Sequence, residues 1–343
     1  METKKEGFPA AFWVCACTEI FERLAYYLGR SLILIFVTAS VATGGLGLSD
    51  TVAANMQSNL TAFSYLLPLF GAVIVDKYIG ARYTTPVGMF IAAAGYFTGG
   101  IAKSSAGVYA MIFLVSLGLA LFKNGAIIGR VITDKSQMDP AFSMRYTLVN
   151  VGAFIGTFLV GILYKDVFAK DGVLGFAPCF KMAALMMVLG GLWYIFVCWR
   201  FLGDLGKLPF KKTLTEEEKA AEAKKKEETG TKQPLTTIEK KRIGAIFVAS
   251  LFSIVFWIFW YLGYMPVYFY WAENMDWVVA GYQVPSTWFD AANSLFCVIL
   301  GPVTAALWKK LAARPQGDMS LFRKTGLGIA IIGLGYIFYA VID

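Results

Sequence analysis

Two glutamates and an arginine stand close together in an apolar stretch that covers about residues 8–41. A charge at the centre of a membrane helix costs roughly 2.5–3.5 kcal/mol, so charged residues there face a bundle interior or a water-filled cavity. Residues three, four or seven positions apart share a helical face. The residues that share this face are Glu19, Arg23, Tyr26 and Arg30, and Glu22 lies one turn below Tyr26. Because a carboxylate can carry a proton and a guanidinium can bind an anion, the pattern predicts a functional site.

The composition indicates what kind of element positions this site. The chain has 343 residues, of which 57% are hydrophobic and 16% are charged. Soluble domains have about 45–50% apolar and about 25% charged residues, so this chain is predicted to be a membrane protein with several spans. The net charge of +8 does not indicate a nucleic-acid partner, because most basic residues lie in loops that the positive-inside rule places in the cytoplasm.

The absence of histidine limits the chemistry that this site can perform. Any proton carried across the membrane must use carboxylates. The five cysteines all fall in apolar segments and include neither a C-x-x-C pair nor a cluster typical of a metal site. The sequence therefore predicts no metal and no cofactor.

Runs of about twenty mostly apolar residues predict nine membrane-spanning helices. They lie near residues 9–41, 50–75, 82–102, 106–133, 140–165, 175–200, 243–270, 284–309 and 321–341. Residues 1–201 are predicted to form an N-terminal six-helix bundle, 202–242 a charged cytoplasmic linker, and 243–343 an incomplete C-terminal bundle of three helices. Basic residues gather on one side, which predicts a multi-pass protein of the cell membrane with a cytoplasmic N-terminus.

Several motifs along the chain together resemble the proton-coupled oligopeptide transporters of the major facilitator superfamily. They are Glu19-x-x-Glu22-Arg23-x-x-Tyr26-Tyr27, Gly71-x4-Asp76-x3-Gly80-Ala81-Arg82, Leu121-Phe122-Lys123-Asn124, Phe142-Ser143-x2-Tyr146-x3-Asn150-Val151-Gly152-Ala153-Phe154 and Ser286-Thr287-Trp288-Phe289-x3-Asn293. The second pattern is shared across the superfamily, so it supports the fold more than the substrate. The resemblance implies an all-α membrane protein with the major facilitator fold.

The resemblance also implies roles for the membrane-embedded charges. It assigns proton coupling to Glu19, Glu22, Arg23 and Lys123. Protonation of a carboxylate would free Arg23 or Lys123 and bias the bundle between inward-open and outward-open states. The structural alternative is a group of salt bridges that only locks the first helix to the fourth.

A cavity with a positive patch and tyrosine rings suits peptides of varied sequence. Arginine and lysine would bind the terminal carboxylate, tyrosine would contact side chains, and asparagine would bind the peptide backbone. The predicted substrate-binding residues are Arg23, Tyr26, Tyr27, Arg30, Tyr65, Lys123, Asn150, Tyr261 and Asn293. Each also has a structural interpretation: Arg30 could extend to the outer interface, the tyrosines could serve packing, and Asn150 could join two helices. The predicted gate residues are Gly71, Asp76, Gly80 and Arg82.

Two of the chain's departures from the family pattern bear directly on its function. Tyr261 stands in the seventh span where many members have Glu or Gln, so it can hydrogen-bond to Arg30 but cannot neutralise it. A complete two-lobe transporter would have twelve core helices, and the nine predicted for this chain stop before Asp343. We therefore expect a fragment that does not alternate access by itself, from a reading frame that continues past Asp343.

Three functions fit these features. The first is proton-driven symport of di- and tripeptides, with peptide, protons and the lipid bilayer as partners. The second keeps the scaffold but carries nitrate or another small anion, which the basic cavity would also suit. The third is a peptide sensor that binds without transport. An enzyme is not expected, because the chain lacks histidine, a metal-ligand cluster and a G-x-S-x-G motif.

Overall fold

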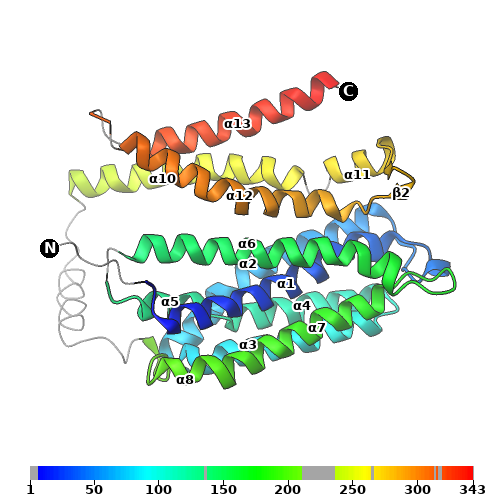
Figure 1. Cartoon of the computed structure of the whole chain (residues 1–343), viewed down its shortest axis with the longest axis horizontal. Coiled ribbons are helices and arrows are strands. Elements are labelled where there is room, and N and C mark those ends of the chain that lie inside the picture. Colours follow the sequence, from blue (N-terminus) through cyan, green and yellow to red (C-terminus); the bar gives the residue numbers. More distant parts are fainter. Residues whose placement is uncertain are drawn as a thin grey trace. The chain divides into compact units, whose positions relative to one another are not determined.

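The computed structural model describes residues 7–134, 137–210, 236–263, 266–312, 314–315 and 319–342. The helices are α1 (Ala10–Thr38), α2 (Asp50–Lys77), α3 (Ala81–Ile101), α4 (Ser105–Leu121), α5 (Asn124–Val131), α6 (Met138–Ile162), α7 (Phe176–Trp193), α8 (Trp199–Leu202), α10 (Thr237–Leu262), α11 (Pro266–Asn274), α12 (Thr287–Ala312) and α13 (Leu321–Ile342). Short helical turns are η1 (Val41–Thr43), η3 (Leu163–Val167) and η4 (Tyr194–Cys198), and strands β1 (Val278–Val279) and β2 (Tyr282–Gln283) pair as a small sheet. Figure 1 shows these elements along the chain.

Helices of membrane-spanning length account for most of the described chain. The stretches that are long and apolar enough to cross a membrane are Asp50–Lys77, Ser105–Val131, Pro140–Val167, Phe176–Leu202, Thr237–Leu262 and Phe322–Val341. Helices α1, α3 and α12 coincide with the other predicted spans, and α1 carries the charged residues noted above. The prediction of an all-α membrane protein is confirmed.

The chain divides into two compact units, which are described separately. The first comprises residues 1–214 with 279–299, and the second comprises 215–278 with 300–343. The domain boundaries predicted from the sequence stay a prediction, and residues 211–235 of the predicted linker lie outside the described residues.

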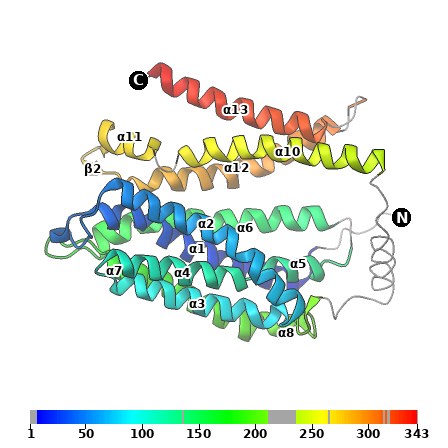
Figure 2. The same ribbon diagram turned by 180° about the vertical axis from the view of Figure 1, so that it is seen from behind.

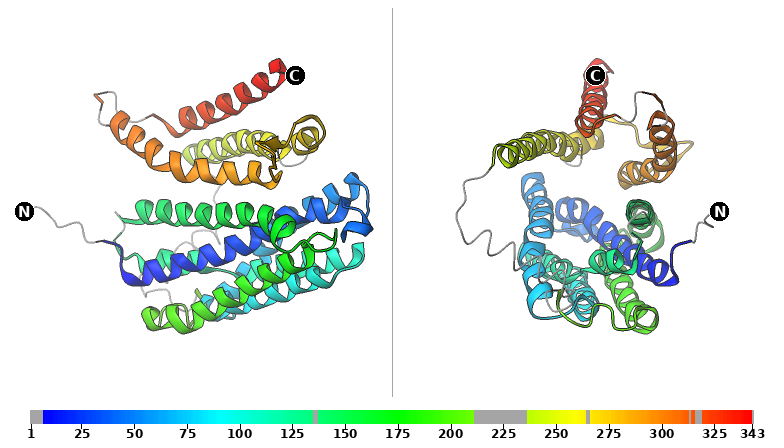
Figure 3. Two further views of the ribbon diagram at one scale, coloured as in Figure 1. Left: turned by 45° about the vertical axis from the view of Figure 1, so that its right-hand side comes forward. Right: turned by 90° about the vertical axis from the view of Figure 1, so that its left-hand side faces the viewer.

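Helix α1 is central to the first unit, where it packs against α2, α5, α6 and α7. Helix α3 packs against α4 and α7, and the two views in Figure 3 show these helices as one bundle. Small residues allow the close approach. A Cβ on Gly118 of α4 would lie 2.4 Å from the carbonyl oxygen of Gly88 on α3. Backbone contact of this kind is a common way for membrane helices to associate, because lipid provides no hydrophobic drive between them.

The fourth predicted span is interrupted in the middle of the first unit. Helix α4 ends at Leu121, and α5 begins at Asn124. Lys123 between them has φ −120° and ψ 33°, and its backbone N–H donates to Thr85 Oγ1 at 3.4 Å. The interruption puts two polar residues at membrane depth: Asn124, which bonds to α1, and Lys123, which bonds to α2.

In the second unit, α10 begins and ends earlier than the predicted span 243–270. A capping box starts α10: Thr236 Oγ1 accepts from the Glu239 backbone N–H at 3.3 Å, and Glu239 Oε2 accepts from the Thr236 N–H at 2.8 Å. Helix α10 packs on α13, where Tyr336 Oη donates to the Phe259 carbonyl at 2.6 Å. Figure 2 shows both helices from behind.

Candidate functional site

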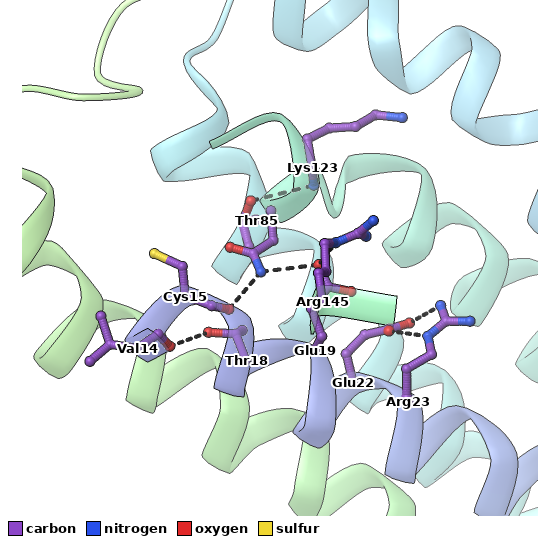
Figure 4. A network of polar contacts seen from close by, with 10 residues as sticks. Val14, Cys15, Thr18, Glu19, Glu22, Arg23, Thr85, Lys123 and Arg145 are labelled. Carbon is purple, nitrogen blue, oxygen red and sulfur yellow. Dashed lines mark hydrogen bonds and ion pairs between the residues drawn. The ribbon is translucent and has the colours of Figure 1, made fainter. Parts of the chain in front are cut away.

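Glu19 has partners from two other helices. Its side chain is 2% exposed, and its Oε1 accepts hydrogen bonds from Asn124 Nδ2 at 3.1 Å and from Arg145 Nε at 3.0 Å. Asn124 Nδ2 also donates to the Cys15 carbonyl at 2.7 Å, so it is bonded to α1 twice. Two donors, one of them charged, compensate a buried carboxylate for much of its lost hydration. Figure 4 shows this network.

Glu22 is fully buried and pairs with its neighbour in the sequence, Arg23. Both carboxylate oxygens accept from the guanidinium, one from Nε and one from Nη2, the latter at 2.5 Å. The Arg23 side chain is 26% exposed, and its Cζ lies 4.9 Å from the centre of the Tyr26 ring. Arg23 is therefore a partly accessible cation held by a carboxylate and an aromatic face.

Lys123 points away from both glutamates, as Figure 4 shows. Its Nζ donates to the carbonyl of Pro68 on α2 at 3.0 Å, and its charge interacts with that of Asp76 on the same helix. In this structure Lys123 is therefore bound to α2, whereas the sequence-based hypothesis grouped it with the two glutamates. Its predicted role in proton coupling stays a prediction.

Arg30 lies further along α1 and is 4% exposed. Its Cζ is 5.7 Å from the centre of the Tyr27 ring, which in turn meets the Tyr26 ring edge-on at a centroid distance of 5.4 Å. Asp290 of α12 lies close enough to interact electrostatically with Arg30. Burial beside a ring and an acid favours a paired arginine over one that extends to the membrane surface.

The other predicted binding residues lie in different surroundings. Asn150 of α6 is 9% exposed, and its Nδ2 donates within its own helix to the Tyr146 carbonyl at 2.9 Å. Tyr65 on α2 is 66% exposed, and Asn293 on α12 is exposed. Tyr261 belongs to the second unit, where its ring meets that of Trp260 edge-on. The residues that the structure brings together are thus those of α1, namely Glu19, Glu22, Arg23, Tyr26, Tyr27 and Arg30.

The predicted gate residue Arg82 joins the start of α3 to the end of α8. Its guanidinium donates to the carbonyls of Gly203 and of Trp199, the latter at 3.0 Å, and lies 5.1 Å from the centre of the Trp199 ring. Its backbone N–H donates to the Gly206 carbonyl at 3.0 Å. A Cβ on Gly80 would lie 2.1 Å from that same oxygen. Arg82 of α3 therefore caps the C-terminal end of α8.

We expect Arg82→Met to lower the free energy of unfolding by roughly 1.5–3 kcal/mol, because two carbonyls lose a charged donor. Chemical unfolding of the purified protein in detergent measures this loss. Lys207→Met is the matched control: the Lys207 side chain is 44% exposed and pairs with an exposed aspartate, so its removal leaves the unfolding midpoint unchanged. Equal midpoints for Arg82→Met and the wild type would contradict the bracing role.

Three residues of the site were not among the predicted site residues: Arg145 and Asn124, which bind Glu19, and Asp290, which lies near Arg30. The same signal that identified Glu19, a charge inside an apolar span, marks Arg145 and Asp290. Within the described ranges, no three acidic or cysteine side chains come together as metal ligands.

Comparison with known proteins shows which proteins this chain resembles. Residues 205–343 match the family model described as "PTR2: POT family". The uncharacterised transporter YclF of Bacillus subtilis (strain 168) is 24% identical in an alignment 371 residues long, gaps included, that covers 96% of this chain and 73% of YclF. A di-/tripeptide transporter of Lactococcus lactis subsp. cremoris is 23% identical in an alignment 382 residues long that covers 96% of this chain and 75% of that protein.

Solved structures of POT transporters have the same fold. A POT family transporter in complex with 5-aminolevulinic acid superposes with a TM-score of 0.82 at 23% identity, covering 98% of this chain and 78% of the other. A POT family transporter in complex with a thioalcohol-conjugated peptide also gives 0.82, at 22% identity, covering 97% and 76%. These matches bear out the resemblance: residues 205–343 match the POT-family model, and the chain has the fold of solved POT transporters over nearly its whole length.

Proposed function

We propose that this chain belongs to a proton-coupled symporter of di- and tripeptides. The observation that carries the proposal is the pair of buried carboxylates on α1, Glu19 and Glu22, each bonded to a guanidinium at membrane depth. Relatives named as di-/tripeptide transporters and a neighbouring structure with a bound peptide conjugate support the substrate class.

The Glu22–Arg23 pair suggests how a proton and a peptide are coupled. A guanidinium binds a carboxylate with two parallel hydrogen bonds, and its single positive charge balances one carboxylate. When Glu22 is ionised, its negative charge already balances that of Arg23. When a proton neutralises Glu22, the partly exposed Arg23 is free for the terminal carboxylate of a peptide. Binding of the proton and binding of the peptide therefore favour each other.

Other residues are proposed to complete the site. Tyr26, Tyr27 and Tyr65 would contact peptide side chains, and Asn150 and Asn293 would contact the peptide backbone. Lys123 would interact with the carboxylates of α1 once its bond to the Pro68 carbonyl breaks. The chain has tyrosine instead of an acid at position 261, and Asp290 supplies a negative charge near Arg30. We propose that Asp290 takes the place of the acid that would otherwise neutralise Arg30.

The proposed setting is the cell membrane, with the N-terminus in the cytoplasm. The proposed partners are a di- or tripeptide, protons and the surrounding lipid. Protons serve as the coupling ion, and no cofactor is required for this chemistry.

A second candidate is transport of nitrate or another small anion, favoured by the two arginines on α1. Arg23 is partly exposed and could bind an anion without a peptide. A peptide sensor that binds without transport is the third.

Uptake of labelled dialanine into liposomes separates these candidates. The product of the complete reading frame is reconstituted with an inward proton gradient. We expect accumulation that stops when a protonophore collapses the gradient and that excess nitrate does not inhibit. Folded protein that accumulates nitrate would favour the anion carrier. Peptide binding without accumulation would favour the sensor. The absence of both peptide binding and peptide uptake would contradict all peptide functions.

A further inference from the structure

Helices α1 and α6 run in the same direction, as Figure 1 shows, and their backbones come into close contact. A Cβ on Gly152 would lie 2.7 Å from the Ile20 carbonyl oxygen, and one on Gly156 would lie 2.4 Å from that of Leu24. No side chain can fill this contact without separating the helices. The two glycines therefore mark a close contact about which α6 can pivot.

The Glu19–Arg145 pair lies on the N-terminal side of this glycine contact. Arg145 comes from α6, and its Nε donates to Glu19 Oε1 at 3.0 Å. Asn124 at the start of α5 donates to the same oxygen at 3.1 Å. Arg145 also lies against α5, since a Cβ on Gly125 would lie 3.1 Å from its Cζ. One carboxylate oxygen on α1 thus binds two other helices.

Glu19 and Glu22 differ in whether their bonds join α1 to another helix. Glu22 bonds the adjacent residue of its own helix, so its charge cannot join α1 to a neighbour through that bond. The bond of Glu19 to Arg145 connects residues 126 positions apart in the chain. Arg145 also attracts the charge of Glu22, but Glu19 is the one of the two carboxylates that bonds directly to another helix.

We infer that Arg145 is a positioning residue that makes the contact between α1 and α6 depend on the charge of Glu19. This inference rests on the proposed function only in taking Glu19 as a proton-binding group. Ionised Glu19 holds the N-terminal part of α6 on α1 and α5. A proton that binds Glu19 forms an O–H bond and removes the negative charge, while Arg145 keeps its own proton. The N-terminal part of α6 is then released and pivots about Gly152 and Gly156.

The surroundings of Glu19 are consistent with such a release. The groups that face it are Arg145 from α6, Asn124 from α5, and Glu22 and Cys15 from α1 itself. Arg145 is the cation among them that bonds Glu19 directly, and its side chain is already 30% exposed. Once unpaired, an arginine on a long side chain moves toward water more easily than it stays beside a neutral acid.

Hydrogen–deuterium exchange of the purified chain tests this inference at one fixed pH. The peptide that covers residues 138–150 reports on the N-terminal part of α6. We expect Glu19→Gln and Arg145→Met each to speed its exchange by roughly 10–150-fold, the factor that corresponds to one lost charge-assisted hydrogen bond. The double variant shows no further increase, because both changes remove the same bond. Arg145→Lys, which keeps the charge, gives a smaller increase, and Lys207→Met gives none.

Several outcomes would overturn the inference. Additive effects in the double variant would show that Glu19 and Arg145 act independently. Unchanged exchange in residues 138–150 for both single variants would show that the pair does not hold α6. If Arg145→Met fails to fold, the same cycle with Arg145→Lys decides between these results.

The exchange experiment needs no transport, so it separates the two proposals. Non-additive exchange without peptide uptake would support the role of Arg145 and contradict the proposed function. Uptake that depends on the proton gradient, together with additive exchange, would support the proposed function and contradict the role of Arg145.

Discussion

Glu22→Gln is expected to reduce proton-driven accumulation of dialanine by about a hundredfold or more, the scale of losing an essential proton-transfer group. Exchange of labelled for unlabelled peptide across the membrane, without a gradient, is expected to persist. Glutamine has the shape of glutamate and can still accept a hydrogen bond from Arg23, but it cannot bind or release a proton. Liposome uptake and counterflow measure the two activities separately.

The same substitution at an exposed acid controls for the change in charge. Glu273 lies exposed on α11, and Glu273→Gln is expected to transport like the wild type. Accumulation by Glu22→Gln at the wild-type level, under a verified gradient, would show that another group carries the proton. Loss of both accumulation and counterflow would instead indicate that Glu22 is needed for peptide binding or folding.

Gly71→Val is expected to lower the free energy of unfolding by about 3 kcal/mol or more, with a marked loss of folded protein. A Cβ at this position would lie 2.0 Å from the carbonyl oxygen of Ala120 on α4. The obstacle is backbone, which cannot rotate away as a flexible side chain can. Helices α2 and α4 must therefore separate along their packed faces. Chemical unfolding in detergent and the yield of monodisperse protein measure the effect.

Gly328→Val on α13 is the matched control for this substitution. Nothing lies within 4 Å of a Cβ at Gly328, so the same change there meets no backbone. Replacing glycine inside a helix also removes an unfavourable propensity, so stability should stay equal or rise slightly. Stable Gly71→Val protein without peptide transport would favour a gating role for Gly71 over its role in packing α2 against α4.

The sequence predicted the helices well because the membrane imposes their length. About twenty apolar residues are needed to span the bilayer, and this requirement is visible without any tertiary contact. The start of α10 was placed too late, since the cap formed by Thr236 and Glu239 lies in a polar segment that apolar runs do not reveal. The interruption at Lys123 was also missed, because residues 106–133 remain apolar enough to resemble one continuous helix.

The sequence by itself determined that Glu19, Glu22, Arg23 and Arg30 share one helix inside the membrane, because spacing and hydropathy are local properties. Only the tertiary structure decided how these charges are paired. Glu22 bonds its own neighbour Arg23, Glu19 bonds Arg145, and Lys123 bonds the Pro68 carbonyl. A buried charge must find a partner, but helix packing decides which distant residue supplies it. That choice depends on contacts such as Gly152 against Ile20, which bring residues far apart in the chain within hydrogen-bonding distance.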